Sequence, residues 1–246
     1  MKHFYLVSNN YFQFKQFKIE QEHCAMKVCT DACLFGAWIV EFLQKKQLTN
    51  PISILDIGTG TGLLSLMTAQ EIDCEIDAVE IEQNAVKQAT ENFMNASFHS
   101  NIIIKQTDIR SWDSNKTYDC IISNPPFFEN DLASPDTKKN LALHSSALSL
   151  KELIEIIDLK LKQTSLAAIL LPYHRKDEMI QLALDKNLFL IVHADIKQTS
   201  KHTFFRTFLI FSRKKQTLLS EEIIIQDNRV YSERFIELLK KYYLAF

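Results

Sequence analysis

The feature that most constrains the fold of this chain is a glycine-rich turn. Three of its four glycines, Gly58, Gly60 and Gly62, fall within five residues, directly after the apolar run 52–57. Glycines at the end of a buried strand let the backbone turn sharply and approach a ligand closely. The apolar pattern of residues 63–70 then predicts a helix. A strand, a glycine turn and a helix in this order are the first unit of a doubly wound α/β fold.

The rest of the chain continues this alternation. Further strands are expected at residues 75–81, 101–106, 118–123, 166–171, 188–194 and 203–212, and helices at 32–46, 83–96, 150–162, 175–186 and 232–243. Such alternation predicts a mostly parallel sheet with helices on both faces. A polar loop without a helix joins the final two strands, so the last strand should be antiparallel. We therefore expect a Rossmann-like α/β fold with a seven-stranded sheet.

The first 29 residues differ from the rest. They are rich in aromatic residues and lysine, and residues 13–19 alternate as in a strand or hairpin. We interpret residues 1–29 as an extension on a single domain formed by residues 30–246. Thr30 and Asp31 are candidates for the N-cap of the helix at 32–46.

Composition excludes several classes of protein. The net charge is −2, so a nucleic acid would have to be held by a local basic patch. No run approaches the roughly 18–20 apolar residues of a membrane helix, and the N-terminus has no secretory signal pattern, so we expect a cytoplasmic protein. The five cysteines are expected to be free thiols, and the spacing of Cys24, Cys29 and Cys33 matches no zinc pattern, so no metal is expected.

Three acidic residues accompany the ends of three successive strands. Asp56 precedes the glycine turn, Glu80 ends the second strand and Asp108 follows the third. The spacing G-x-G-x-G departs from the dinucleotide pattern G-x-G-x-x-G, and a carboxylate at the loop suits a cation better than a pyrophosphate, which disfavours an NAD oxidoreductase. S-adenosylmethionine carries a sulfonium and an ammonium group and no phosphate. Glu80 would then accept from the ribose hydroxyls and Asp108 from the adenine amino group.

A second motif, Asn124-Pro125-Pro126-Phe127, follows the fourth strand. An exocyclic amine is a poor nucleophile because its lone pair is delocalised into the ring. The Asn124 side-chain oxygen and the Pro125 carbonyl could accept its two hydrogens and orient it, while the prolines fix the backbone. Phe127 would offer an apolar face to an unstacked base.

With these two motifs the chain resembles class I S-adenosylmethionine-dependent methyltransferases that act on amino groups. Segments 14–17, 24–31, 34–38, 143–144 and 231–244 narrow the resemblance to the bacterial tRNA1(Val) adenine-N6 methyltransferase family, over nearly the whole chain. Two departures from the family pattern are Cys29, where glycine is expected, and Leu143, where arginine is usual before His144.

The resemblance implies a reaction and a set of site residues. A methyl group would pass from S-adenosylmethionine, leaving S-adenosylhomocysteine, to an adenine beside the anticodon of a tRNA. We expect a monomer. The implied cofactor residues are Lys27, Thr30, Asp31, Asp56, Gly58, Thr59, Gly60, Gly62, Glu80, Ile81, Asp108, Ile109 and Asn124; the implied substrate residues are Phe128, His144, Lys15, Lys18 and Arg206. Thr30 and Asp31 could equally serve only as a helix cap, and His144 could be an ordinary loop histidine. The polar stretch 129–144 is expected to be a mobile lid.

Other functions stay open at this point. A protein glutamine-N5 methyltransferase uses a similar Asn-Pro-Pro motif, but such proteins usually bear an N-terminal helical domain. DNA adenine and ribosomal-RNA amino-methyltransferases are further alternatives. A cofactor-binding RNA-binding module without catalysis is the non-enzymatic alternative, and the intact Asn124 disfavours it.

Overall fold

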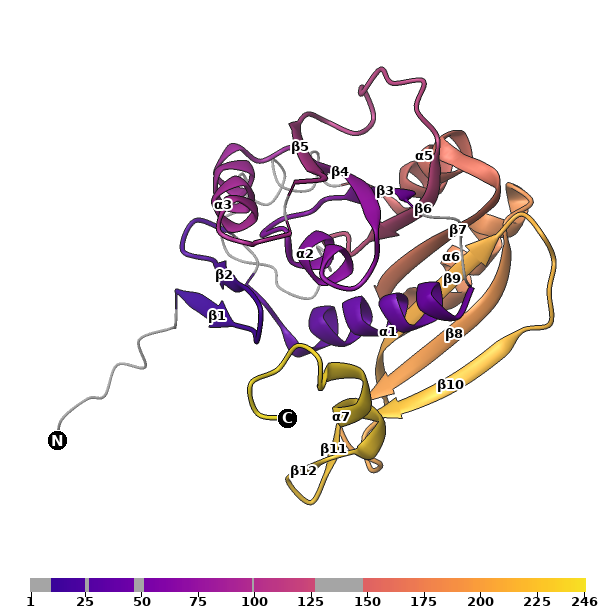
Figure 1. Ribbon diagram of the computed structural model, residues 1–246. Helices are drawn as coiled ribbons and strands as arrows, with labels where there is room; N and C mark the ends of the chain where they lie inside the picture. Colours follow the sequence, from indigo (N-terminus) through magenta and orange to yellow (C-terminus); the bar gives the residue numbers. More distant parts are fainter. Residues whose placement is uncertain (1–9, 25–26, 47–50, 99, 127–147) are drawn as a thin grey trace, which may run out of the picture.

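The computed structural model describes residues 10–24, 27–46, 51–98, 100–126 and 148–246, and its centre is one large sheet (Figure 1). The strands of this sheet are β3 (Ile52–Ile57), β4 (Cys74–Glu80), β5 (Ile102–Gln106), β6 (Tyr118–Ser123), β7 (Leu161–Pro172), β8 (Phe189–Lys197), β9 (Phe204–Ser212) and β10 (Leu219–Ile224). Their spatial order is β10-β8-β9-β7-β6-β3-β4-β5. Only β9 runs against its neighbours, because it pairs antiparallel with both β7 and β8.

The sheet corrects the expected strand count from seven to eight. The strand predicted at 203–212 is antiparallel as expected, but it is not the last, because β10 follows and pairs parallel with β8. β10 is an edge strand with Glu221 and Glu222 in its middle, and of its residues only Ile223 is fully buried. A strand without alternation and with so little buried apolar surface gives almost no periodic signal, and pairing with β8 is what stabilises it.

Helices cover both faces of the sheet, as predicted. They are α1 (Thr30–Lys46), α2 (Leu63–Ala69), α3 (Gln83–Met94), α5 (Leu150–Lys160), α6 (Lys176–Asp185) and α7 (Glu233–Leu239), with a 3-10 turn η1 at Tyr173–Arg175. α1, α2, α3 and α7 contribute to one apolar core, whereas α5 and α6 pack against the opposite face (Figure 1).

Several boundaries differ from the prediction. α1 begins at Thr30, so Thr30 is a helical residue and does not precede the helix as a cap. The helix expected to reach residue 162 ends at Lys160, and β7 starts at Leu161 rather than 166. The polar residues Lys162–Ser165 give no strand pattern of their own, yet pairing of Leu161 with Tyr118 extends the strand back to this point.

The N-terminal residues form the predicted hairpin, with β1 (Tyr11–Gln13) antiparallel to β2 (Lys18–Glu20). Phe14 and Phe17 lie in its turn and stack with their ring centroids 4.5 Å apart. Both rings, with Ile19, are buried in the same apolar core as α1 and α7. The hairpin therefore adds to the main core and joins the two ends of the described chain.

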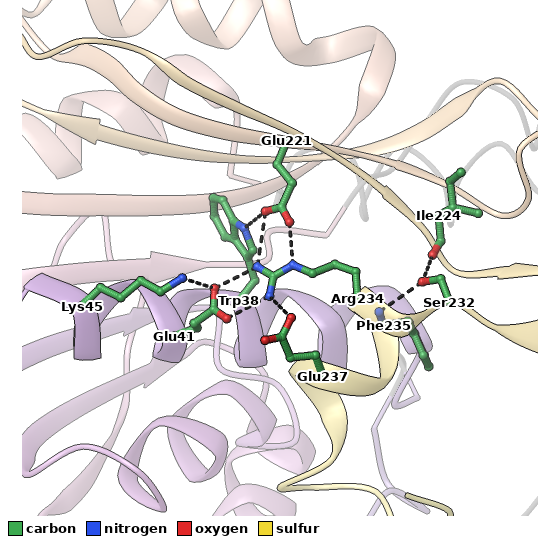
Figure 2. Close-up of polar contacts among 9 residues, drawn as sticks. All are labelled: Trp38, Glu41, Lys45, Glu221, Ile224, Ser232, Arg234, Phe235 and Glu237. Carbon is green, nitrogen blue, oxygen red and sulfur yellow. Dashed lines mark hydrogen bonds and ion pairs between the residues drawn. The ribbon is translucent and has the colours of Figure 1, made fainter.

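The C-terminal helix is held by one arginine (Figure 2). The guanidinium of Arg234 donates to both carboxylate oxygens of Glu41 on α1, at 2.8 Å each, and to Glu221 on β10 at 2.6 Å. Glu221 also accepts from the indole of Trp38 at 3.0 Å, and Glu237 pairs with Arg234 from within α7. Three separate parts of the chain thus meet at a single cation.

This cluster predicts a measurable effect on stability. Arg234→Ala should lower the free energy of unfolding by about 1–3 kcal/mol, because it leaves Glu41 and Glu221 facing each other without their shared cation. Arg175→Ala is the matched control: Arg175 pairs with Glu178 on the surface of α6, and exposed pairs of that kind contribute about 0–1 kcal/mol. Chemical denaturation of both variants tests the difference, and equal losses would contradict it.

The same cluster predicts a dependence on pH. Hydrogen bonds from Arg234 lower the pKa of Glu41 to about 2, from an ordinary value of 4.5. A lowered pKa in the folded state means that the stabilisation is complete above about pH 4.5 and is lost as the pH falls through about 2. The stability difference between the wild type and Arg234→Ala should therefore shrink over this acidic range; a difference that stays constant would contradict the assignment.

Candidate functional site

The glycine turn has the backbone conformation that the sequence predicts. Gly58, Gly60 and Gly62 have φ values of 71°, 56° and 83°, in the left-handed region that favours glycine. A Cβ at Gly62 would come within 2.4 Å of the Phe93 ring, so close packing against α3 also requires glycine there. At Gly58 and Gly60, by contrast, no atom of the residues that the structure describes lies within 4 Å of where a Cβ would be, the two chain neighbours aside. The turn therefore leaves open space along its outer side, where a ligand could approach the backbone.

Asp56 lies beneath this turn and is completely buried. One carboxylate oxygen accepts from the hydroxyls of Thr59 and Ser65, both at 2.7 Å, while the other oxygen has no hydrogen-bond partner among the described residues. Burial raises the pKa of Asp56 to about 6, and the two hydroxyl bonds only partly offset this. A buried carboxylate with an unsatisfied oxygen is costly without a cation nearby, which suits a positively charged ligand.

Glu80, at the end of β4, fixes the neighbouring backbone. Its carboxylate accepts from the backbone amide of Gly60 at 3.0 Å, and from the amides of Ile81 and Glu82 at 2.9 Å each. A carboxylate has about four acceptor positions, so roughly one is left for a ligand. Glu80 can take one ribose hydroxyl without rearrangement, and a second hydroxyl would have to share an oxygen with a backbone amide.

Asp108 follows β5 and is bound by an arginine that the sequence analysis did not single out. The Arg110 guanidinium donates to both Asp108 oxygens at 2.7–3.0 Å, and the Arg110 backbone amide adds a bond of 2.9 Å. These bonds hold the pKa of Asp108 below its ordinary value. Arg110 also reaches Glu152, which closes the capping box of α5 with Ser149. The guanidinium and the backbone amide of Arg110 together fix the orientation of the Asp108 carboxylate.

Asn124 follows β6 at the same edge of the sheet. Ile57, the last residue of β3, pairs with Val79 of β4 on one side and with Ser123 of β6 on the other. The Ser123 hydroxyl donates to the Ile57 carbonyl at 2.9 Å and ties the two strand ends together. The half-buried Asn124 and the buried Pro125 therefore leave the sheet next to the glycine turn. The expected juxtaposition of the two motifs is present in the fold.

The residues before and at the start of α1 differ in their exposure and in their contacts. Lys27 and Thr30 are exposed, whereas Asp31 accepts from the Arg206 guanidinium at 2.7 Å and from the Ala32 amide at 3.1 Å. Arg206, at the start of β9, is thus brought to Asp31 from far along the chain. The role of Lys27, Thr30 and Asp31 in covering the cofactor stays a prediction.

The two N-terminal lysines make contacts within the protein. The Lys15 ammonium donates to the carbonyls of Lys240 and Phe246 at 2.6 and 2.5 Å, so it joins the hairpin to the C-terminal residues. Lys18 pairs with Glu20 and lies 5.2 Å from the Tyr11 ring centroid. Their predicted role in RNA binding would require these contacts to be exchanged.

Some expected site residues lie outside the described part of the chain. These are Phe127, Phe128, His144 and the stretch 129–144. Pro126 is the last described residue of the Asn-Pro-Pro motif. Within the described ranges, no group of three or more His, Cys, Asp or Glu side chains could hold a metal ion, and no helix is long and apolar enough to span a membrane.

Comparison with known proteins gives consistent matches. Residues 36–153 match the family model described as the methyltransferase small domain. The tRNA1(Val) (adenine(37)-N6)-methyltransferases of Cytophaga hutchinsonii and Dyadobacter fermentans are 37% and 39% identical to this chain, each over 97% of it and 99% of the relative. That of Pseudoalteromonas translucida is 39% identical, over 95% of this chain and 98% of the relative.

Solved structures agree on the fold. An Agrobacterium tumefaciens protein described as a predicted O-methyltransferase superposes with a TM-score of 0.64 at 13% identity, covering 86% of this chain and 96% of that one. A methyltransferase from Pyrococcus furiosus gives 0.50 at 20% identity, covering 73% and 83%. At these identities the likeness establishes the fold alone.

Proposed function

Because the chain belongs to the family of tRNA1(Val) (adenine(37)-N6)-methyltransferases, we propose that it transfers a methyl group to the N6 amine of adenine 37 in tRNA1(Val). The observation that carries this proposal is the placement of Asn124 and Pro125 at the end of β6, directly beside the glycine turn of β3. An amine-binding motif and a cofactor-binding turn on adjacent strands are what such a transfer requires.

The cofactor in this proposal is S-adenosylmethionine, which when bound supplies an electrophilic methyl group on a sulfonium and is left as S-adenosylhomocysteine. The residues present fit it: Gly58 and Gly60 leave open space, and the unsatisfied oxygen of Asp56 favours a cation nearby. Glu80 would hold the ribose and Asp108 the adenine. Thr59, Gly62, Ile81 and Ile109 would shape the same site, and Lys27, Thr30 and Asp31 would cover it.

Asn124 and Pro125 would orient the target amine. The Asn124 side-chain oxygen and the Pro125 carbonyl accept its two N–H hydrogens, which directs the nitrogen lone pair toward the methyl group. Their fixed dipoles also stabilise the positive charge that develops on the nitrogen, and its surplus proton then passes to solvent. Pro125 and Pro126 restrict φ and keep the accepting carbonyl in place.

The substrate part of the proposal needs an adenine outside its stack. Bases of an anticodon loop are single-stranded and can be turned out of the stack at modest cost. Phe127 and Phe128 are proposed to contact the ring, with His144, Lys15, Lys18 and Arg206 on the surrounding RNA. An enzyme of this kind would act in the cytoplasm, as a monomer.

Arg110 leads to a prediction about adenine recognition. With three donors of Arg110 on Asp108, about one of its four acceptor positions remains, which suits a single N–H of the adenine amine. The wild type should bind S-adenosylhomocysteine at least tenfold more tightly than its 6-oxo analogue S-inosylhomocysteine. Arg110→Ala should reduce this ratio several-fold and Arg175→Ala should leave it unchanged, as measured by calorimetry. An unchanged ratio in Arg110→Ala would rule out the positioning role.

A direct assay tests the proposed reaction. The purified protein is incubated with tritiated S-adenosylmethionine and, separately, unmodified tRNA1(Val) transcript, ribosomal RNA, duplex DNA and a release-factor protein. Label in the transcript alone, found as N6-methyladenosine at position 37 after digestion, is the expected result. Label in guanosine, DNA or protein glutamine would replace the proposal with one of the other amino-methyltransferase activities.

A further inference from the structure

The edge of the sheet beside Asn124 forms a step. β6 stops at Ser123, opposite Ile169 of β7, whereas β7 continues to Pro172. Pro172 pairs with Arg206 of β9, which in turn pairs with Ile196 of β8. β7, β9 and β8 lie side by side (Figure 1) and extend about 10 Å beyond the end of β6, at 3.3 Å per residue. The segment that carries the Asn-Pro-Pro motif leaves the sheet where β6 ends, on the shorter side of this step.

Two aromatic rings lie on top of the step. Tyr173, directly after β7, and Phe204, the first residue of β9, have ring centroids 4.9 Å apart and planes inclined by 35°. Both residues are half-buried, so each is partly accessible to solvent. The Lys197 ammonium lies 4.2 Å from the centroid of Phe204 and that of Lys176 5.5 Å from Tyr173. Aromatic rings beside cations are the usual components of a platform for unstacked bases.

The two lysines are themselves held in place by acids. Lys176 pairs with the buried Asp195 at 2.7 Å, and Asp195 also accepts from the Thr207 hydroxyl at 2.7 Å. Lys197 pairs with Glu222 at 3.0 Å. These pairs compensate most of the positive charge, so the surface is suited to stacking more than to phosphate attraction. They also fix the rings in advance, which lowers the entropy cost of binding.

A short loop beside the rings supplies an exposed cation. It joins β8 to β9, and is held internally by the Thr199 hydroxyl against the His202 ring at 2.7 Å. Ser200 anchors it to Asp227 through both its amide and its hydroxyl. Lys201 is exposed at its tip, and in the part of the chain that the structure describes its side chain has no ion pair or hydrogen bond. The loop thus presents an exposed lysine just beyond the last pair of β8 and β9, Lys197 and Phe204.

We propose that Tyr173, Phe204 and Lys201 form a binding surface for the single-stranded RNA next to the target adenine. A neighbouring base stacks on the Tyr173–Phe204 pair, and Lys201 contacts a phosphate of the same strand. The inference rests on the proposed function, because it requires an RNA whose target base is turned toward Asn124. It adds that the step beside β6 positions the flanking nucleotides, so that the adenine enters the site in one orientation.

Steady-state methylation of unmodified tRNA1(Val) transcript tests this surface. Tyr173→Leu and Phe204→Leu should raise KM for the transcript roughly 5- to 140-fold, the equivalent of one lost base stack. Their affinity for S-adenosylmethionine and their Tm should stay close to the wild-type values. Tyr173→Phe keeps the ring and should stay within about threefold of the wild-type KM, which shows that the hydroxyl is not required. An unchanged Tm in the Leu variants separates the loss of a base stack from a loss of packing.

Lys201 is tested by salt dependence. Lys201→Ala should lower the slope of log affinity against log salt by about 0.7, the value for one phosphate contact on a single strand. Lys215→Ala is the matched control, because Lys215 is also exposed but follows the C-terminal end of β9, at the end of the sheet away from the Asn-Pro-Pro motif. A wild type that does not methylate tRNA defeats the proposed function. If the wild type methylates tRNA but the Tyr173→Leu, Phe204→Leu and Lys201→Ala variants behave like Lys215→Ala, the proposed surface is wrong and the proposed function stands.

Discussion

Replacing Asn124 with alanine is expected to lower kcat for tRNA methylation by about 10²- to 10³-fold or more, with little change in the affinity for S-adenosylmethionine. The reason is the position of the side chain. It follows Ser123, whose hydroxyl is bound to the end of β3, so the backbone at this point is held whether or not the amide is present. The substitution removes an acceptor for the target amine without loosening the glycine turn.

The experiment separates catalysis from binding. Cofactor affinity is measured by calorimetry and the chemical step by single-turnover methylation of tRNA1(Val) transcript. Asn101→Ala is the control, because Asn101 is exposed just before β5 begins, at the end of the strands away from the glycine turn and Asn124. Losing cofactor binding and turnover together would show that Asn124 is structural. A variant with near-normal kcat would mean that other groups orient the amine.

The parts of the fold that the sequence predicts well are those with strong local signals. The strands 52–57 and 118–123 have the predicted boundaries, because each is an apolar run that ends at glycine or at Asn-Pro-Pro. β10 has no such signal: its apolar residues stand only at its two ends, with no alternation, and it exists because β8 offers a free edge. Its stability comes from pairing, which no local pattern contains.

The candidate site also combines residues that the sequence predicts with contacts that it does not. Asp56, Glu80 and Asp108 could be placed from sequence because each lies at or next to the end of a strand, and parallel strands bring those ends to one edge. Their partners could not all be placed. Arg110 lies two residues from Asp108, which was an available signal, but Arg206 reaches Asp31 from 175 residues away. A contact at that separation depends on the whole sheet being assembled.

The sequence predicts that Glu80 ends a strand, but its bond to the Gly60 backbone is seen only in the structure. Removing the Glu80 carboxylate should have the largest effect on cofactor binding. Glu80→Ala is expected to raise the Kd for S-adenosylmethionine by about 10²-fold. One charge-assisted bond to the ribose is lost, which contributes about 1.5–3 kcal/mol. The amide of Gly60 also loses its acceptor, so the glycine turn is less fixed before binding.

A neighbouring acid provides the control for charge and for helix capping. Glu82 accepts from the Ala85 amide at 2.7 Å and caps α3, but makes no contact with the glycine turn among the bonds of the described residues. Glu82→Ala should therefore lower Tm slightly and leave the Kd within about threefold. Glu80→Gln should fall between the two, because its amide keeps one acceptor oxygen but turns N–H groups toward backbone amides. If Glu80→Ala and Glu82→Ala weaken binding equally, general charge loss explains the effect and the ribose contact does not.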